Sequence, residues 1–296
     1  MCCFSSQKTE SAGSGREDDP IGSWESTELI SRDRQTKLKS QTFFASIDQR
    51  DESAGGESAC TALVAVITDA LHSKGAYTPT RSEFDTLIRQ GSSEWQKLCN
   101  DASYINRFPN KHFDLDTVLE AKIRPISVLQ EKSFIGFFQP ESFQSLRGAM
   151  SFDGIWNEIT SDVGAEPRIY IVSWNDHFFV LKVDSDAYYI IDTLGERLFE
   201  GCTKAYILKF EDSAEMYRLS ENSEEGDGDE LICKGKECCR EFIKRFLAAI
   251  PLREELEVEE KGMGNANTAL HQKLQIEFHL TEACSNEIVV DDIDWW

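Results

Sequence analysis

The hydrophobic pattern of residues 60–122 is helical. From Cys60 to Leu71 apolar residues cover most of the circumference of a predicted helix, which is typical of a helix buried inside a domain. The pair Gly55-Gly56 breaks the chain before this helix, and Ser58 is a good N-cap. Apolar residues at helical spacing predict further helices over 82–88, 92–100 and 114–121.

The pattern then changes to that of strands. One more helix is predicted over 152–159, and short polar turns join the β-branched and aromatic runs that follow it. These runs predict strands over 123–129, 168–174, 177–183, 187–192 and 205–210. Helices followed by strands joined in this way predict an α+β domain, in which the buried helix that starts at Cys60 packs on an antiparallel sheet.

Polar and acidic segments flank this domain. A further helix over 234–250, ended by Pro251, and an alternating strand over 274–280 follow the domain, and we expect both to pack on it. The predicted organisation is a disordered segment over 1–38, the α+β domain over 39–212, an acidic linker over 213–232, the added helix and strand over 233–281, and an acidic tail over 282–296.

The charge of the chain narrows the choice of partners. The formal net charge is −22 over 296 residues, and 211–232 together with 282–296 hold much of it. Nucleic acid is a poor partner for such a surface, because phosphate binding needs clustered lysine and arginine. A protein or peptide partner, and a basic one in particular, fits better.

The cysteines and the hydropathy predict an intracellular protein. Nine cysteines without a Cys-x-x-Cys pair favour reduced thiols over a disulfide framework or a zinc ribbon. The start of the chain has no secretory signal, and the longest apolar run is far too short for a membrane span. We expect a cytoplasmic protein, with the nucleus as a further location.

Three residues at the ends of predicted elements suggest a chemistry. Cys60 lies at the start of its helix, His177 begins one strand, and Asp192 closes the next. A helix N-terminus and an imidazole both favour a thiolate, which is the reactive form of cysteine. His177 would take the thiol proton and later protonate the leaving group, and Asp192 would orient the imidazole.

The turn between the two strands tests this arrangement. If Ser185 and Asp186 form a two-residue turn, position 184 pairs with 187, and His177 lies one diagonal step from Asp192 on the same face. A three-residue turn would place Asp192 on the other face. The short turn therefore supports the site, and the longer one counts against it.

Other side chains are candidates for supporting roles. Gln49 and Gln41 are candidates for an oxyanion hole, and Trp174 and Asn175 for the cleft. His112 is an alternative base. Each residue also has a plain interpretation: a cysteine on an apolar helix usually packs in the core, and a glutamine in a polar loop is usually solvated.

The His and Asp strands carry a resemblance to a known family. The segments His177–Val183 and Tyr188–Gly195 resemble those of papain-like peptidases, especially the bacteriocin-leader-processing type. Two departures accompany this: Thr61 replaces the glycine that usually follows the cysteine, and no glutamine lies about six residues before Cys60. The resemblance implies a papain-like fold and a Cys60–His177–Asp192 site that uses no metal or organic cofactor.

A second resemblance covers most of residues 40–281. The segments 41–67, 111–115, 173–179 and 235–244 are similar to the C-terminal half of plant proteins that carry an amino-terminal NT-type C2 domain. This resemblance implies a common origin more than a function.

Taken together, these features of the sequence predict a papain-like thiol hydrolase acting on an amide or isopeptide bond, with a non-catalytic protein-interaction module as the alternative.

Overall fold

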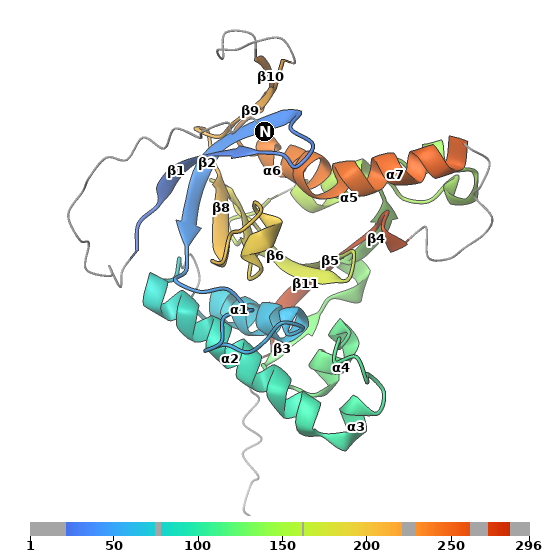
Figure 1. The fold of residues 1–296 in the computed structure, drawn as a ribbon. Helices are drawn as coiled ribbons and strands as arrows, with labels where there is room; N and C mark the ends of the chain where they lie inside the picture. The colour runs from blue at the N-terminus through green and yellow to red at the C-terminus, as the bar shows by residue number, and fades with distance from the viewer. Residues whose placement is uncertain (1–21, 75–77, 162, 221–228, 261–271, 285–296) are drawn as a thin grey trace, which may run out of the picture.

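The computed structural model describes residues 22–74, 78–161, 163–220, 229–260 and 272–284 (Figure 1). The predicted disorder of residues 1–21 and the predicted tail from 285 onward lie outside these ranges. None of the described helices is both long and apolar enough to cross a membrane.

A large antiparallel sheet forms the centre of the molecule. Among the described residues it contains eleven strands, in the order β10-β9-β2-β8-β7-β6-β5-β11-β3, with β1 beside β2 and β4 beside β11. The strands are β1 Glu25–Ile30, β2 Thr36–Phe44, β3 Ile126–Val128, β4 Phe134–Phe137, β5 Arg168–Trp174, β6 His177–Val183, β7 Tyr188–Asp192, β8 Tyr206–Phe210, β9 Glu215–Arg218, β10 Glu230–Lys234 and β11 Gln275–Ala283.

Helices cover both faces of the sheet (Figure 1). The first group is α1 Cys60–Lys74, α2 Arg81–Asn100, α3 Ala102–Ile105 and α4 Leu115–Glu120, and the second is α5 Phe152–Thr160, α6 Glu237–Phe242, the π-helical η5 Ile243–Ala248 and α7 Ala249–Glu260. The short 3-10 turns are η1 Gln130–Lys132, η2 Pro140–Ser142, η3 Gln144–Leu146 and η4 Gly195–Arg197. The structure confirms an α+β fold with N-terminal helices packed on an antiparallel sheet.

Alternate residues of the central strands belong to two different cores. Val180, Ile191 and Ile207 pack with α1 and α2 in one core. Leu181 and Ile190 pack with α5 and α6 in the other. Because both faces are covered, most residues of these strands are apolar. The central helix α1 is therefore held against the sheet, where it packs on β5, β6 and β11.

The close approach of α1 and α2 depends on a glycine. The sequence predicts two helices over 82–100, but α2 is continuous, with a capping box in which Thr80 and Glu83 bond each other's backbone N–H groups. Gly91 lies within it, where a Cβ would be 2.8 Å from the Cα of Leu63 in α1. Gly91 thus allows the two helices to touch.

We expect Gly91→Ala to lower the free energy of unfolding by about 1–3 kcal/mol, because the added methyl overpacks this contact. Intrinsic helix propensity alone would predict a gain of about 1 kcal/mol. Urea denaturation measures the change. Gly164→Ala is the matched control, since a Cβ there meets nothing within 4 Å; a stabilising Gly91→Ala would contradict the packing argument.

The flanking segments differ from their prediction. The strand β1 and the first residues of β2 lie within the stretch predicted to be disordered, and β9 and the start of β10 lie within the predicted acidic linker. These strands lie at one side of the sheet and are polar, and β1 buries only Leu29. Strands of this kind lack the apolar alternation that marks a half-buried strand.

The C-terminal helix also differs from its prediction. Helix α7 continues to Glu260, although Pro251 was expected to follow the helix end. The π-helical η5 ends at Ala248, so Pro251 lies in the first turn of α7. Pro251 therefore lies inside a continuous helical stretch, where a proline removes one backbone N–H donor, and the π-helical η5 just before it changes the hydrogen-bond register of the helix at this point.

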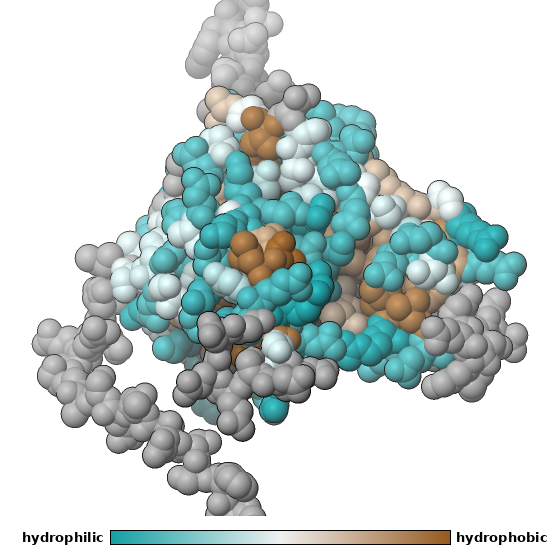
Figure 2. All heavy atoms as spheres, turned by 90° about the horizontal axis from the view of Figure 1, so that it is seen from above, coloured by the Kyte–Doolittle hydropathy of each residue, from teal (hydrophilic) through white to brown (hydrophobic). Residues whose placement is uncertain are grey.

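The surface is mostly polar. Figure 2 shows a largely hydrophilic face with hydrophobic side chains in a few separate patches. The large apolar side chains that are exposed come from β1, β4, β10 and two loops, and they are Ile30, Ile135, Met150, Phe199 and Leu231. Scattered apolar residues of this kind are ordinary on a protein surface.

Candidate functional site

Cys60 is the first residue of α1. The carbonyl of Ala59 accepts the N–H of Leu63 at 2.9 Å, so Ala59 holds the N-cap position expected for Ser58. Cys60 is 6% exposed. The first N–H groups of a helix lack acceptors within it, and the positive end of the helix dipole lies there. The sulfur is therefore placed where a negative charge is stabilised.

His177 and Asp192 lie side by side at the ends of two neighbouring strands. The two-residue turn is present: the N–H of Asp184 bonds the carbonyl of Ala187 at 3.2 Å, and Val183 pairs with Tyr188. This register places His177 Nε2 at 2.8 Å from Asp192 Oδ1. His177 is 5% exposed and Asp192 1%.

Asp192 is held by several further donors. Its Oδ1 also accepts the N–H of Leu194 at 2.9 Å, and its Oδ2 accepts the hydroxyl of Tyr206 at 3.3 Å. Arg197 Nε lies 3.4 Å from the same Oδ2. Burial raises the pKa of Asp192, but the charge and hydrogen bond of His177, with Arg197 and Leu194, leave this pKa below its ordinary value. The carboxylate is thus kept ionised and fixed.

The thiol and the imidazole interact directly. His177 lies close enough to act on the Cys60 thiol, and because its Nε2 faces Asp192, Nδ1 is the ring nitrogen left for the sulfur. Burial raises the pKa of Cys60, but the hydrogen bond and charge of His177 leave it below its ordinary value. Burial lowers the pKa of His177, but the charge and hydrogen bond of Asp192, together with the interaction with Cys60, leave this pKa above its ordinary value. Both shifts favour a thiolate–imidazolium pair.

Gln49 connects the two halves of the site. Its side chain is buried; Nε2 donates to the carbonyl of Glu57 at 2.8 Å, and Oε1 accepts the hydroxyl of Thr193 at 2.7 Å. The backbone N–H of Gln49 bonds the carbonyl of Thr193 at 3.0 Å. Glu57 precedes Cys60 by three residues, and Thr193 follows Asp192 directly. An amide carries two N–H donors, so one remains beyond the bond to Glu57.

The other predicted residues lie elsewhere. Gln41 pairs with Lys209 on β8, three residues from the Tyr206 that pairs with Asp192. This is roughly 10 Å along the strand, and the odd spacing places Gln41 on the opposite face of the sheet. His112 is exposed, with Nε2 3.2 Å from Ser58 Oγ, so it is outside the His177–Asp192 pair.

Thr61, which departs from the family pattern, lies next to the sulfur, and its side chain contributes to lowering the pKa of Cys60. Its hydroxyl donates to the carbonyl of Phe113 at 2.7 Å and is buried. Gly56 is required by packing, because a Cβ there would lie 2.3 Å from Ser92 Oγ. Both residues thus fix the start of α1.

Trp174 and Asn175 lie beside the pair and line a separate cavity. Trp174 is directly opposite His177 in the β5–β6 ladder, and its Nε1 donates to the carbonyl of Lys273 at 3.0 Å. Asn175 and Asp176 form the turn between them, both with positive φ, which is typical of a two-residue hairpin turn. This turn fixes the position of His177.

Sequence reasoning missed Arg197, Tyr206 and Thr193. Tyr206 begins a strand that was predicted, but its contact with Asp192 depends on β8 pairing with β7. Arg197 lies in a turn next to Asp192, and its guanidinium stacks over the Trp174 ring at 5.1 Å. The signal available was their proximity to Asp192 along the chain or across a strand pair, which is weak without the sheet order.

Comparison with known proteins adds a family. A family model described as a domain of unknown function, DUF8490, matches residues 26–281. No curated protein matches the chain. One similar solved structure is the ubiquitin-specific protease encoded by murine cytomegalovirus tegument protein M48, in complex with a ubiquitin-based suicide substrate. Its TM-score is 0.45 at 13% identity, over 84% of this chain and 89% of the viral chain. This likeness is too weak to assign an activity.

Proposed function

Because the chain belongs to the family of a domain of unknown function, DUF8490, whose description names no activity, we propose a function from the site itself. We propose a papain-like thiol hydrolase that cleaves an amide or isopeptide bond of a protein or peptide. The observation that supports this most is the chain of contacts from Cys60 through His177 to Asp192 at the N-terminus of α1. Such a chain supplies a nucleophile, a base and an orienting group.

The proposed reaction proceeds in two steps. The Cys60 thiolate attacks the carbonyl carbon, and the protonated His177 gives its proton to the leaving amine as the carbon–nitrogen bond breaks. This leaves a thioester on Cys60. Water then attacks the thioester while His177 removes its proton, and the acid product leaves as the thiolate–imidazolium pair forms again. Asp192 holds Nε2 throughout, so Nδ1 stays directed at the reacting atoms.

The oxyanion of each step needs donors. The N–H of Cys60 at the helix start is one candidate, and the second N–H of the Gln49 amide is another. Gln49 is favoured over Gln41 because it bonds the segments on both sides of the site. In this proposal Gln49 also positions the chain before Cys60.

An electrophilic substrate tests the proposal. We expect a ubiquitin-based or peptide-based suicide substrate to form a covalent adduct on Cys60, located by peptide mass spectrometry, and no adduct on the Cys60→Ala variant. Adducts at the exposed Cys284 with an unmodified Cys60 would contradict the proposal. A panel of both probe types is needed, because the site alone does not select between peptide and isopeptide bonds.

We expect Gln49→Ala to reduce kcat for hydrolysis by about 10²–10³, the usual loss when one oxyanion donor is removed. Gln41→Ala is the matched control and is expected to leave kcat unchanged, because Gln41 lies on the other face of the sheet. Steady-state kinetics on any substrate found with the suicide probes measures both. Equal losses in the two variants would contradict the role of Gln49.

One observation favours the alternative, a non-catalytic protein-interaction module on the same scaffold. Cys60 and His177 are only 6% and 5% exposed, and a substrate carbonyl needs access to the sulfur. In that case the acidic surface would bind a basic protein, and the suicide probes would leave Cys60 unmodified in a folded chain. The relation to plant NT-type C2 proteins stays a prediction and supports neither function.

A further inference from the structure

A cavity of about 260 Å³ borders the His177–Asp192 pair on the side of Arg197. The turn after β5, η4 and the helix formed by η5 and α7 enclose it. Its lining includes three cations, Arg32, Arg197 and Lys273, and one carboxylate, Glu254. Such a lining is notable in a chain with a net charge of −22.

Two of the three cations, Arg32 and Arg197, have unused hydrogen-bonding capacity. The third, Lys273, is already paired: its Nζ lies 3.5 Å from Glu254 and 3.8 Å from Glu255. Arg32 donates only to the backbone carbonyl of Glu196, at 2.6 Å, and no carboxylate among the described residues pairs with it. Arg197 shares Asp192 with His177, and its Nη2 is buried without a hydrogen-bond partner in the described part of the chain.

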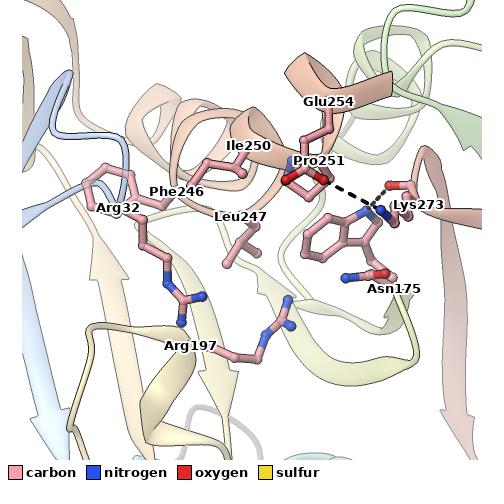
Figure 3. Close-up of a pocket in the computed structure, with 10 residues that line it drawn as sticks. Arg32, Asn175, Arg197, Phe246, Leu247, Ile250, Pro251, Glu254 and Lys273 are labelled. Atoms are coloured by element: carbon pink, nitrogen blue, oxygen red, sulfur yellow. Dashed lines mark hydrogen bonds and ion pairs between the residues drawn. The ribbon is translucent and has the colours of Figure 1, made fainter. Parts of the chain in front are cut away.

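Unpartnered buried donors are uncommon, because burying a polar group without a hydrogen bond costs about 1–3 kcal/mol. Figure 3 shows the guanidinium groups of Arg32 and Arg197 pointing into the same space beneath Leu247. Trp174 covers one face of the Arg197 guanidinium. An anion can therefore bind at the edge of this guanidinium group, where its N–H groups lie. A guanidinium edge matches the two oxygens of a carboxylate.

The opposite wall of the cavity is apolar. It comes from η5 and the start of α7, through Phe246, Leu247 and Ile250 (Figure 3). Phe246 and Leu247 are buried at this wall. A ligand that fills the space therefore needs both a negative group for the arginines and an apolar body for the helix.

We propose that this cavity binds a carboxylate that carries an apolar body, with the carboxylate between Arg32 and Arg197. A free carboxylic acid and the C-terminal carboxylate of a peptide share this chemistry. Inorganic phosphate matches the arginines but leaves the apolar wall uncovered. The proposal does not depend on hydrolysis at Cys60, because Cys60 is not among the residues that line the cavity.

Isothermal titration of the full chain with 3-phenylpropanoate tests the proposal, and its amide, 3-phenylpropanamide, is the neutral control. We expect saturable binding of the acid and at least tenfold weaker binding of the amide. Arg32→Gln is expected to weaken binding of the acid about tenfold or more, since a charged hydrogen bond contributes about 1.5–3 kcal/mol. Arg218→Gln, which removes an exposed arginine on β9, is expected to leave it unchanged.

Several results would overturn the proposal: no saturable binding of the acid, equal binding of acid and amide, or equal losses in Arg32→Gln and Arg218→Gln. Inorganic phosphate binding as tightly as the acid would also overturn it, because the apolar wall would then contribute nothing. N-acetylphenylalanine serves as a peptide C-terminus. If N-acetylphenylalanine binds more tightly than 3-phenylpropanoate, the carboxylate that the cavity recognises is the C-terminus of a peptide. If 3-phenylpropanoate binds more tightly, it is that of a free carboxylic acid.

Discussion

Replacing His177 by alanine is expected to slow the alkylation of Cys60 by iodoacetamide at least about tenfold near pH 6. The reason is that only the thiolate reacts, and the hydrogen bond and charge of His177 outweigh the burial that raises the pKa of Cys60. Without the imidazole, burial still raises the pKa of Cys60, and only the smaller contributions of the Phe178 backbone and the Thr61 side chain lower it. Peptide mass spectrometry of a time course gives the rate for Cys60 separately from the other cysteines.

Two further variants make this result specific. His177→Gln keeps a donor for Asp192 and removes the base, so it is expected to slow alkylation as alanine does while retaining more stability. His72→Ala removes the imidazole from another position of α1, where its Nε2 lies 2.9 Å from the Thr281 hydroxyl, and is expected to leave the rate unchanged. An unchanged rate in both His177 variants would show that the imidazole does not act on the sulfur.

Replacing Asp192 by alanine is expected to lower the free energy of unfolding by about 3–5 kcal/mol, the usual loss when one partner of a buried ion pair is removed. The change leaves His177, Arg197 and Tyr206 without the carboxylate that each contacts. Urea denaturation near neutral pH measures it. Glu230→Ala breaks the exposed pair with Arg218 and is expected to change stability by at most about 1 kcal/mol.

The effect of Asp192→Ala should depend on pH in a definite direction. The pKa of Asp192 is lowered by folding, so its contribution is present above the ordinary value of 3.8 and is lost as the pH falls through the lowered pKa. The pKa of His177 is raised, so its contribution is complete below 6.5 and is lost as the pH rises through the raised pKa. The difference between wild type and variant is therefore largest between these two values. A difference that is constant with pH would contradict the ion pair.

The central strands could be predicted from the sequence because they are apolar on both faces. The predicted strands over 168–174 and 177–183 coincide with β5 and β6, and the predicted α5 and β11 differ from the observed bounds by few residues. The relative position of His177 and Asp192 followed from the length of one turn. The sequence left two turn lengths open, and the structure shows the two-residue turn that places both side chains on the same face.

The remaining features depend on contacts between distant segments. Nothing in the pattern around Arg197 or Tyr206 indicates that both meet Asp192, since that requires the order of β7 and β8 and the stacking on Trp174. The polar strands β1 and β9 form because neighbouring strands supply their hydrogen bonds. Likewise, the continuation of α7 past Pro251 depends on the π-helical turn before it. Tertiary pairing decides each of these cases.

The rate of alkylation of Cys60 in the wild-type protein near pH 6, compared with that of Cys284 in the same sample, tests the central claim most directly. Cys284 is exposed and Cys60 is buried, so accessibility alone predicts that Cys284 reacts faster. Activation of Cys60 by His177 predicts the opposite order. Faster reaction of Cys284, with Cys60 unmodified in the folded chain, would contradict a reactive thiolate at the start of α1.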